Sequence, residues 1–247
     1  MKNKKSLGQN WLKNREILEE IAGLAGEGKL CVEIGPGLGT LTSSLLRRFE
    51  KVIAVEFDAD LAAKLSGSFP GKNLEVVNED ILKFDFDAVE GPYVVAGNIP
   101  YYITSPIIKK VLEAQNKPER VVLLVQKEVA ERIVDERETV LSLFVKNRAL
   151  VYAGPVVSRA EFTPPPKVDS EVLVMEPYAE PLAKEEVFDL IRRGFSNPRK
   201  KLVHNLAGLK SREELERVFE ECGISQDARP GEVGLSKWAE LNEKLKL

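Results

Sequence analysis

The sequence contains few cysteines, one histidine and no long apolar run. Its 247 residues include only Cys31 and Cys222, which stand far apart and exclude a disulfide framework or a cysteine-rich zinc site. His204 has no histidine partner, so we expect no metal. The longest aliphatic run, Val121–Val125, is too short to span a bilayer, and residues 1–10 lack the apolar segment of a secretory signal. These absences favour a cytoplasmic protein that does not enter membranes.

The net charge is also small, but the charges are unevenly distributed. The 36 Lys and Arg residues nearly balance the 39 Asp and Glu residues, which by itself argues against a nucleic-acid partner. Residues 1–15 and residues 192–210, however, carry basic side chains and no acidic ones. Two basic segments on an acidic protein could form one face for a polyanion, or they could be ordinary solvated runs. Charge alone leaves both interpretations open.

Residues 14–175 alternate between short apolar runs and amphipathic stretches, which predicts an α/β fold with a mostly parallel sheet covered on both faces. The expected strands are Leu30–Ile34, Val52–Glu56, Leu74–Asn78, Tyr93–Gly97 and Val121–Gln126. Helices are expected from a cap at Asn14 to Gly26 and over Leu41–Phe49, Asp60–Ser68 and Ser105–Ala114. Two last strands, Leu150–Val157 and Val168–Met175, are too close in sequence for a crossover helix and should form an antiparallel hairpin.

The pattern changes after Pro177 and Pro181. Strand-like runs stop, and three helical stretches follow at Glu185–Gly194, Ser211–Cys222 and Ser236–Leu247. We therefore expect two domains, an α/β domain over residues 1–178 and a small all-helical domain over residues 179–247.

A glycine-rich segment, Val32–Thr40, closes the first expected strand and opens a helix. Gly35, Gly37 and Gly39 allow positive φ angles and close approach of a ligand to the backbone, although a tight turn alone would also use them. The spacing differs from the dinucleotide fingerprint, and the lysine of a P-loop is absent.

An acidic residue ends the second expected strand, and another follows the third. Glu56 stands about 20 residues after the glycines and can accept hydrogen bonds from ribose hydroxyls, and Asp80 can accept one from the amino group of an adenine. Each acid alone could be a solvated carboxylate. Together with the glycines they predict a site for an adenosine-bearing ligand without a pyrophosphate, which points to S-adenosylmethionine (SAM).

The fourth strand ends in Asn98-Ile99-Pro100-Tyr101, at the edge of the sheet where ligands of such folds bind. The Asn98 side-chain carbonyl and a backbone carbonyl fixed by Pro100 could accept both hydrogens of an amino group, which favours a pyramidal nitrogen with an available lone pair. Tyr101 offers a ring on which a base can stack. A proline-kinked loop with a buried tyrosine is the alternative.

A proline-rich loop, Phe162–Ser170, joins the last two expected strands. Its prolines give a stiff backbone, and Phe162 could stack on the opposite face of the same base. The alternative is a rigid connector with a core phenylalanine.

These motifs resemble the ribosomal RNA adenine N6,N6-dimethyltransferase family over nearly the whole chain. The matching segments are Ser6–Leu12, Glu33–Gly39, Asn98–Tyr101, Gln126–Ile133, Phe162–Ser170 and Phe195–Leu202. The resemblance implies a Rossmann-like class I SAM-dependent methyltransferase domain, with a seven-stranded, mostly parallel sheet, followed by a small helical domain.

The resemblance also implies roles for single residues. The set expected to contact SAM is Asn10, Leu12, Gly35, Gly37, Glu56, Asp80 and Asn98. Asn98 and Pro100 would serve the target amine, and Tyr101 and Phe162 would sandwich a flipped adenine. The basic ends suggest RNA contacts by Lys4, Lys5, Arg199, Lys200 and Lys201. The implied substrate is a pair of adjacent adenosines in the 3′-terminal hairpin loop of small-subunit (16S) rRNA in an immature 30S-type particle, methylated by a monomer.

The sequence departs from the family pattern at Trp11, where phenylalanine is usual, and at Val134–Val140, which replaces a glycine-containing loop. The second change puts RNA contacts by this loop in doubt. Two other functions stay open: the macrolide-resistance type of enzyme, which methylates large-subunit rRNA, and a non-catalytic RNA-binding assembly factor. The Phe195–Leu202 segment favours the small-subunit enzyme over the former, and intact Glu56, Asp80 and Asn98 argue against the latter.

Overall fold

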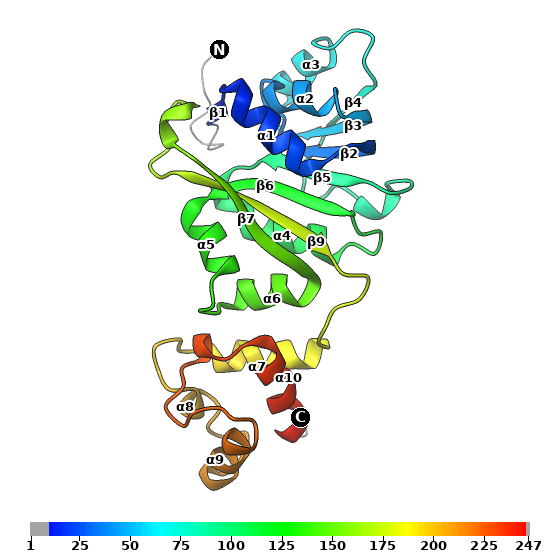
Figure 1. Cartoon of the computed structure of the whole chain (residues 1–247). Coiled ribbons are helices and arrows are strands. Elements are labelled where there is room, and N and C mark those ends of the chain that lie inside the picture. The colour runs from blue at the N-terminus through cyan, green and yellow to red at the C-terminus, as the bar shows by residue number, and fades with distance from the viewer. Residues whose placement is uncertain (1–9, 246–247) are drawn as a thin grey trace. The chain divides into compact units, whose positions relative to one another are not determined.

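The computed structural model describes residues 10–245. The chain divides into two compact units, Met1–Ala130 with Leu150–Pro177 and Glu131–Ala149 with Tyr178–Leu247 (Figure 1). Lys4 and Lys5, two of the expected RNA-binding residues, lie outside the described residues. Within the part that is described, no helix combines the length and apolar character needed to cross a bilayer.

Seven strands form one sheet in the order β4-β3-β2-β5-β6-β9-β7. Their bounds are β2 (Gly28–Ile34), β3 (Phe49–Glu56), β4 (Leu74–Asn78), β5 (Val94–Asn98), β6 (Arg120–Gln126), β7 (Ala149–Val157) and β9 (Ser170–Pro177). The five strands from β4 to β6 are parallel, and β9 runs antiparallel to β6. The expected seven-stranded, mostly parallel sheet is confirmed, with β7 beside β9 at the edge.

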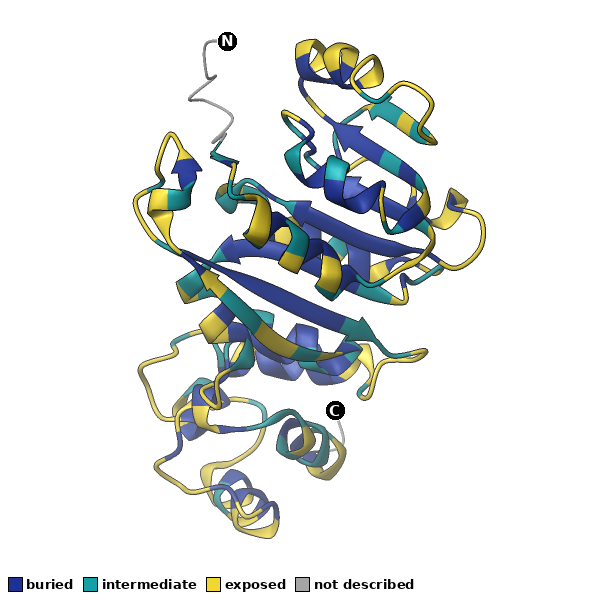
Figure 2. Cartoon of the chain, turned by 45° about the horizontal axis from the view of Figure 1, so that its top comes forward, coloured by how far each residue is buried: buried dark blue, intermediate teal, exposed yellow. Residues whose placement is uncertain are grey.

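The central strands are buried because helices cover both faces of the sheet. All five residues of Val121–Val125 in β6 are inaccessible to solvent, as expected of a parallel strand that is covered on two sides (Figure 2). The helices of this unit are α1 (Arg15–Ala25), α2 (Thr40–Leu45), α3 (Ala59–Ser66) and α4 (Thr104–Glu113), together with the start of α5 (Lys127–Val134), which continues into the second unit.

Helix α1 begins where the sequence predicted. The Asn14 side chain accepts hydrogen bonds from the backbone N–H groups of Glu16 and Ile17, and Gly26 ends the helix with φ 90°. Helix α2 is shorter than the expected Leu41–Phe49. It ends at Leu45 because Phe49 is buried and its backbone pairs with Gly28 at the start of β3.

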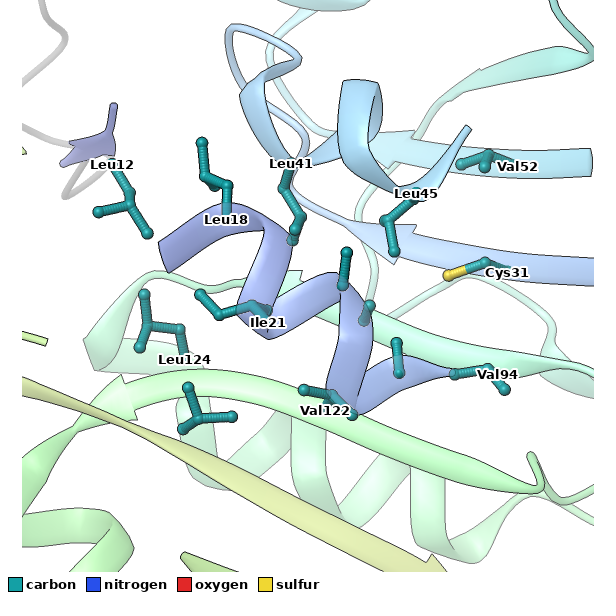
Figure 3. Close-up of a cluster of buried hydrophobic side chains, with 14 of the residues drawn as sticks. Leu12, Leu18, Ile21, Cys31, Leu41, Leu45, Val52, Val94, Val122 and Leu124 are labelled. Carbon is teal, nitrogen blue, oxygen red and sulfur yellow. The ribbon is translucent and has the colours of Figure 1, made fainter. Parts of the chain in front are cut away.

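A hydrophobic cluster fixes α1 and α2 against the sheet. Figure 3 shows Leu18 and Ile21 of α1 beside Leu41 and Leu45 of α2, above Val122 and Leu124 of β6. Cys31, Val52 and Val94 complete this cluster from β2, β3 and β5. Burial of so many aliphatic groups, at roughly 1.5–3 kcal/mol per side chain, holds the loops that start these helices in place.

The second unit is helical. It contains α6 (Val140–Arg148), α7 (Glu185–Gly194), α8 (Leu202–Asn205), α9 (Arg212–Glu221) and α10 (Leu235–Leu245). Trp238 of α10 is fully buried, and its ring lies 6.1 Å from that of Phe195. The three helices expected between Glu185 and Leu247 correspond to α7, α9 and α10. Helix α8 was not expected, because its four residues are too few to show a helical period.

This unit also includes residues 131–149, which the sequence analysis placed in the first domain. The reason is the packing of α6. The ring of Phe144 meets that of Phe188 on α7 edge-on, and the Arg148 guanidinium lies 4.1 Å above the Phe144 ring. The backbone N–H of Glu138 donates to the carbonyl of Gly231. Sequence order alone hides such contacts between distant segments.

Candidate functional site

A cavity of about 250 Å³ opens at the carboxyl ends of β2, β3 and β5. The strand register explains its position, because Ile34 of β2 is paired with Val55 of β3 on one side and with Gly97 of β5 on the other. The segments after these three strands therefore meet. The predicted residues that line the cavity are Asn10, Gly35, Gly37, Glu56, Asp80, Asn98, Pro100 and Tyr101.

The glycine-rich loop needs glycine at the positions where it turns. Gly35, Gly37 and Gly39 have φ angles of 65°, 57° and 79°, in the left-handed region that side chains disfavour. A Cβ on Gly39 would lie 2.7 Å from the Cδ1 of Leu65, and one on Gly37 would lie 3.2 Å from the indole nitrogen of Trp11. The glycines therefore allow the tight turn and also leave the backbone of the loop accessible to a ligand in the cavity.

Glu56 holds this loop from the end of β3. One carboxylate oxygen accepts from the backbone N–H of Gly37 at 3.0 Å and the other from that of Asp58 at 2.8 Å. Burial raises the pKa of Glu56, although these two hydrogen bonds work in the opposite direction. Each carboxylate oxygen has a further lone pair, so the side chain can still accept from ligand hydroxyls.

Asp80 and Phe57 form the neighbouring wall of the cavity. The Asp80 side chain accepts from the backbone N–H of Leu82 at 3.0 Å, which fixes the turn after β4. Phe57 follows Glu56 and is 62% exposed, an unusual position for a large apolar ring. The two carboxylates, Glu56 and Asp80, and an exposed ring in one cavity have the chemistry to bind a nucleoside.

Asn98 has a fixed orientation at the end of β5. Its Nδ2 donates to the backbone carbonyl of Asn10 at 3.1 Å. With the amide nitrogen held there, the Oδ1 acceptor has no partner among the described residues. Pro100 follows with extended geometry, φ −61° and ψ 131°, and directs the chain into the short 3₁₀ turn Tyr101–Ile103.

Tyr101 is fixed by a residue whose role the sequence did not indicate. Its hydroxyl lies 2.7 Å from the Oγ of Ser170, which is fully buried at the start of β9. Burial raises the pKa of Tyr101, so the phenol stays protonated at neutral pH. The only sequence signal was that Ser170 ends the proline-rich motif.

Leu12 and Phe162 lie outside the cavity wall. They face each other in a small antiparallel pair of strands, β1 (Trp11–Leu12) and β8 (Phe162–Thr163). Both side chains belong to the hydrophobic cluster under α1 and α2, in which Figure 3 labels Leu12, and they are 1% and 3% exposed. The alternative interpretation, a core phenylalanine, describes Phe162 in this structure, and stacking on a base would require the loop to move.

The three expected RNA-binding residues of the second unit differ from one another. Arg199 and Lys200 are exposed in the turn before α8. Asn205 stabilises this turn, because its amide nitrogen donates to the carbonyls of Gly194 and Asn197. Lys201 forms an ion pair with Asp227. Part of the charge of the basic segment is therefore already neutralised.

Sequence comparisons with known proteins identify the family of this chain. The sequence matches the family described as Ribosomal RNA adenine dimethylase over residues 1–246. It is 37% identical to "Ribosomal RNA small subunit methyltransferase A" of Levilactobacillus brevis, covering 96% of this chain and 88% of the relative. Its identity to the protein of that name from a Picosynechococcus species is 38%, covering 99% and 98%.

Comparison with solved structures shows that two RNA-modifying methyltransferases have the same fold. The 23S rRNA methyltransferase ErmE superposes with a TM-score of 0.80 at 29% identity, covering 96% of this chain and 100% of that one. A dimethyladenosine transferase from Plasmodium falciparum superposes with a TM-score of 0.82 at 28% identity, covering 96% and 98%.

The fold and the cavity thus define a class I methyltransferase that uses SAM. The chain belongs to the ribosomal RNA adenine dimethylase family, as its motifs suggested. The cavity fits this cofactor: the carboxylates of Glu56 and Asp80, which can accept hydrogen bonds, stand at adjacent strand ends, and backbone of the glycine-rich loop lines the same cavity.

The contact between Tyr101 and Ser170 gives a test of how the ring is held. Tyr101→Phe and Ser170→Ala should each lower the kcat of methyl transfer about 3–10-fold, the value of one hydrogen bond, with little change in SAM affinity. The double variant should be no worse than either single variant, because both remove the same contact. The measurement is a double-mutant cycle on kcat.

Tyr152→Phe is the matched control, because this tyrosine of β7 is not among the residues that line the cavity and its hydroxyl donates to Glu176, so the variant should keep the full kcat. Additive losses in the double variant would show that the two hydroxyls act separately and would contradict this assignment.

Proposed function

We propose that this protein transfers methyl groups to the N6 atoms of two adjacent adenosines in the 3′-terminal hairpin loop of 16S rRNA. The substrate would be rRNA in an immature 30S-type particle in the cytoplasm, and the protein would act as a monomer. Support for small-subunit rRNA comes from the relatives named for that activity, which match 96–99% of this chain. The observation that carries the chemistry is the orientation of Asn98.

Asn98 orients the target amine. Its Oδ1 and a backbone carbonyl fixed by Pro100 can accept one N6 hydrogen each. These two hydrogen bonds favour a pyramidal nitrogen, whose lone pair then points toward the methyl group of SAM. SAM supplies an electrophilic methyl group on a sulfonium when it is bound. No strong base is required, because the N6 proton becomes acidic once the nitrogen is alkylated. The work of Asn98 is thus orientation and stabilisation of charge.

Glu56, Asp80 and the backbone of Gly35 and Gly37 would hold the cofactor. Glu56 can accept from the ribose hydroxyls and Asp80 from the adenine amino group, as their positions at adjacent strand ends allow. Tyr101 would stack on the target base, and its contact with Ser170 would keep the ring in position. Phe162 would complete the stack only after the β8 loop moves, because its ring is buried.

The macrolide-resistance type of enzyme is the second candidate, since ErmE shares the fold over 96% of this chain. The purified protein should therefore be assayed with SAM on immature 30S particles and on protein-free 23S rRNA. We expect dimethyladenosine in the 30S particle at adjacent positions and at most trace incorporation into 23S rRNA. Methylation of 23S rRNA alone would overturn the proposal in favour of the second candidate.

Arg199 and Lys200 are proposed to contact RNA phosphates, with Lys201 contributing less because it is paired with Asp227. In the Arg199→Ala/Lys200→Ala double variant, the slope of log K against log salt should become shallower by about 1.4–1.8, at roughly 0.7–0.9 per phosphate contact. Binding of a 16S fragment that contains the hairpin is measured over a range of salt concentrations.

Arg212→Ala serves as the control, because Arg212 is also exposed but is paired with Glu216 within α9. Its slope should match that of the wild type. An unchanged slope in the double variant would remove Arg199 and Lys200 from the RNA face.

A further inference from the structure

Two consecutive tyrosines line the cavity, and the proposed function uses only the first of them. Tyr101 is half-buried and bonded to Ser170, whereas Tyr102 is 64% exposed. The Tyr102 hydroxyl makes no hydrogen bond with any residue between 10 and 245. Single exposed tyrosines are common on protein surfaces. One that lines a ligand cavity has a ring face available to a substrate.

The backbone that carries the Tyr102 ring is fixed. The N–H of Ile103 donates to the carbonyl of Pro100 at 3.2 Å, which closes the 3₁₀ turn around Tyr102. The turn leads directly into α4, and Ile107 and Ile108 of that helix are buried in the core. The exposed ring therefore has a constant point of attachment beside the cavity.

Tyr101 and Tyr102 are not arranged to hold one base between them. A 3₁₀ turn has three residues per turn, so successive side chains leave the backbone about 120° apart. The two rings therefore point in different directions from neighbouring positions. A base that stacks on Tyr101 leaves the ring of Tyr102 available for a second base.

The position of Tyr102 favours RNA over the cofactor as its ligand. Phe57, the exposed ring at the end of β3, stands beside Glu56, where we place the adenosine part of SAM. Tyr102 instead follows the segment Asn98–Tyr101 at the end of β5, which receives the target base in the proposed function. In an RNA strand, the group beside the target base is the adjacent base.

The adjacent base needs a new stacking partner when the target is flipped. Flipping removes the target base from the stack and leaves one face of its neighbour uncovered, which costs free energy. An aromatic side chain can cover that face, because every base has a π-face on which a ring can stack. Such a contact lowers the free energy of the flipped state and of the transition state that follows it.

We propose that Tyr102 stacks on the base adjacent to the flipped adenosine, so that the enzyme binds the two adjacent adenosines as a unit. Tyr101 holds the target base, and Tyr102 holds its neighbour. The inference deepens the proposed function and rests on it, because it requires two adjacent adenosines in the RNA. Tyr102 is in this account a substrate-binding residue that determines specificity for the adjacent pair.

Substrates with a single target adenosine test this proposal. In one series of immature 30S particles the 5′ adenosine of the pair is replaced, and in a second series the 3′ adenosine. The replacement is either purine riboside, which stacks but lacks the amino group, or an abasic nucleotide, which cannot stack. The kcat/KM for methylation of the remaining adenosine is measured with the wild type and with Tyr102→Ala.

The quantity to compare is the ratio of kcat/KM for the purine substrate to that for the abasic substrate. Effects of the replacement on the free RNA cancel between the two proteins, because both act on the same particles. In at least one series we expect the ratio to be about 5–140-fold larger for the wild type than for Tyr102→Ala. This factor is the value of stacking one base on an aromatic side chain, roughly 1–3 kcal/mol at tenfold per 1.4 kcal/mol.

Tyr102→Phe is the matched control, because it keeps the ring and removes only a hydroxyl without a partner among the described residues. It should retain the wild-type ratio. SAM affinity should be the same in the wild type and both variants. Because the ring is 64% exposed, its removal in Tyr102→Ala leaves the core intact.

Equal ratios for the wild type and Tyr102→Ala in both series would overturn the proposal, even where the variant methylates every substrate more slowly. Weaker SAM binding by Tyr102→Ala would assign the ring to the cofactor and would also overturn it. The proposed function survives either result when the wild type methylates the unmodified particle. Absence of that methylation would overturn both proposals.

Discussion

The parallel pairing of β2 with β3 on one side and β5 on the other is the constraint on which the site depends. Parallel strands end at the same edge, so the loops after Ile34, Glu56 and Asn98 must meet there. The hydrophobic cluster under α1 and α2 keeps these loops in place, because α2 starts directly at the end of the glycine-rich loop. The cofactor cavity follows from this arrangement rather than from any single motif.

Three of the proposed functional side chains are held by specific contacts with other residues. Glu56 is held by the N–H groups of Gly37 and Asp58, Asn98 by the carbonyl of Asn10, and Tyr101 by Ser170. These contacts do not block ligand binding, because each leaves an acceptor or a ring face available to a ligand.

Much of this arrangement was predictable from sequence because it is local. The strands, the Asn14 cap, the glycine-rich loop and the acids after β3 and β4 depend on short-range patterns. What sequence could not give depends on packing between distant segments. Examples are the burial of Phe162 against Leu12, the ion pair between Lys201 and Asp227, and the grouping of α6 with the second unit.

The central claim is that a fixed Asn98 amide directs methyl transfer to adjacent adenosines of small-subunit rRNA. Mass spectrometry of that rRNA from cells lacking the gene tests the claim most directly. We expect N6,N6-dimethyladenosine to disappear, to return with the wild-type gene, and to stay absent with the gene for Asn98→Ala produced at the same level. Persistence of the modification in the deleted cells, or its full return with Asn98→Ala, would contradict the account.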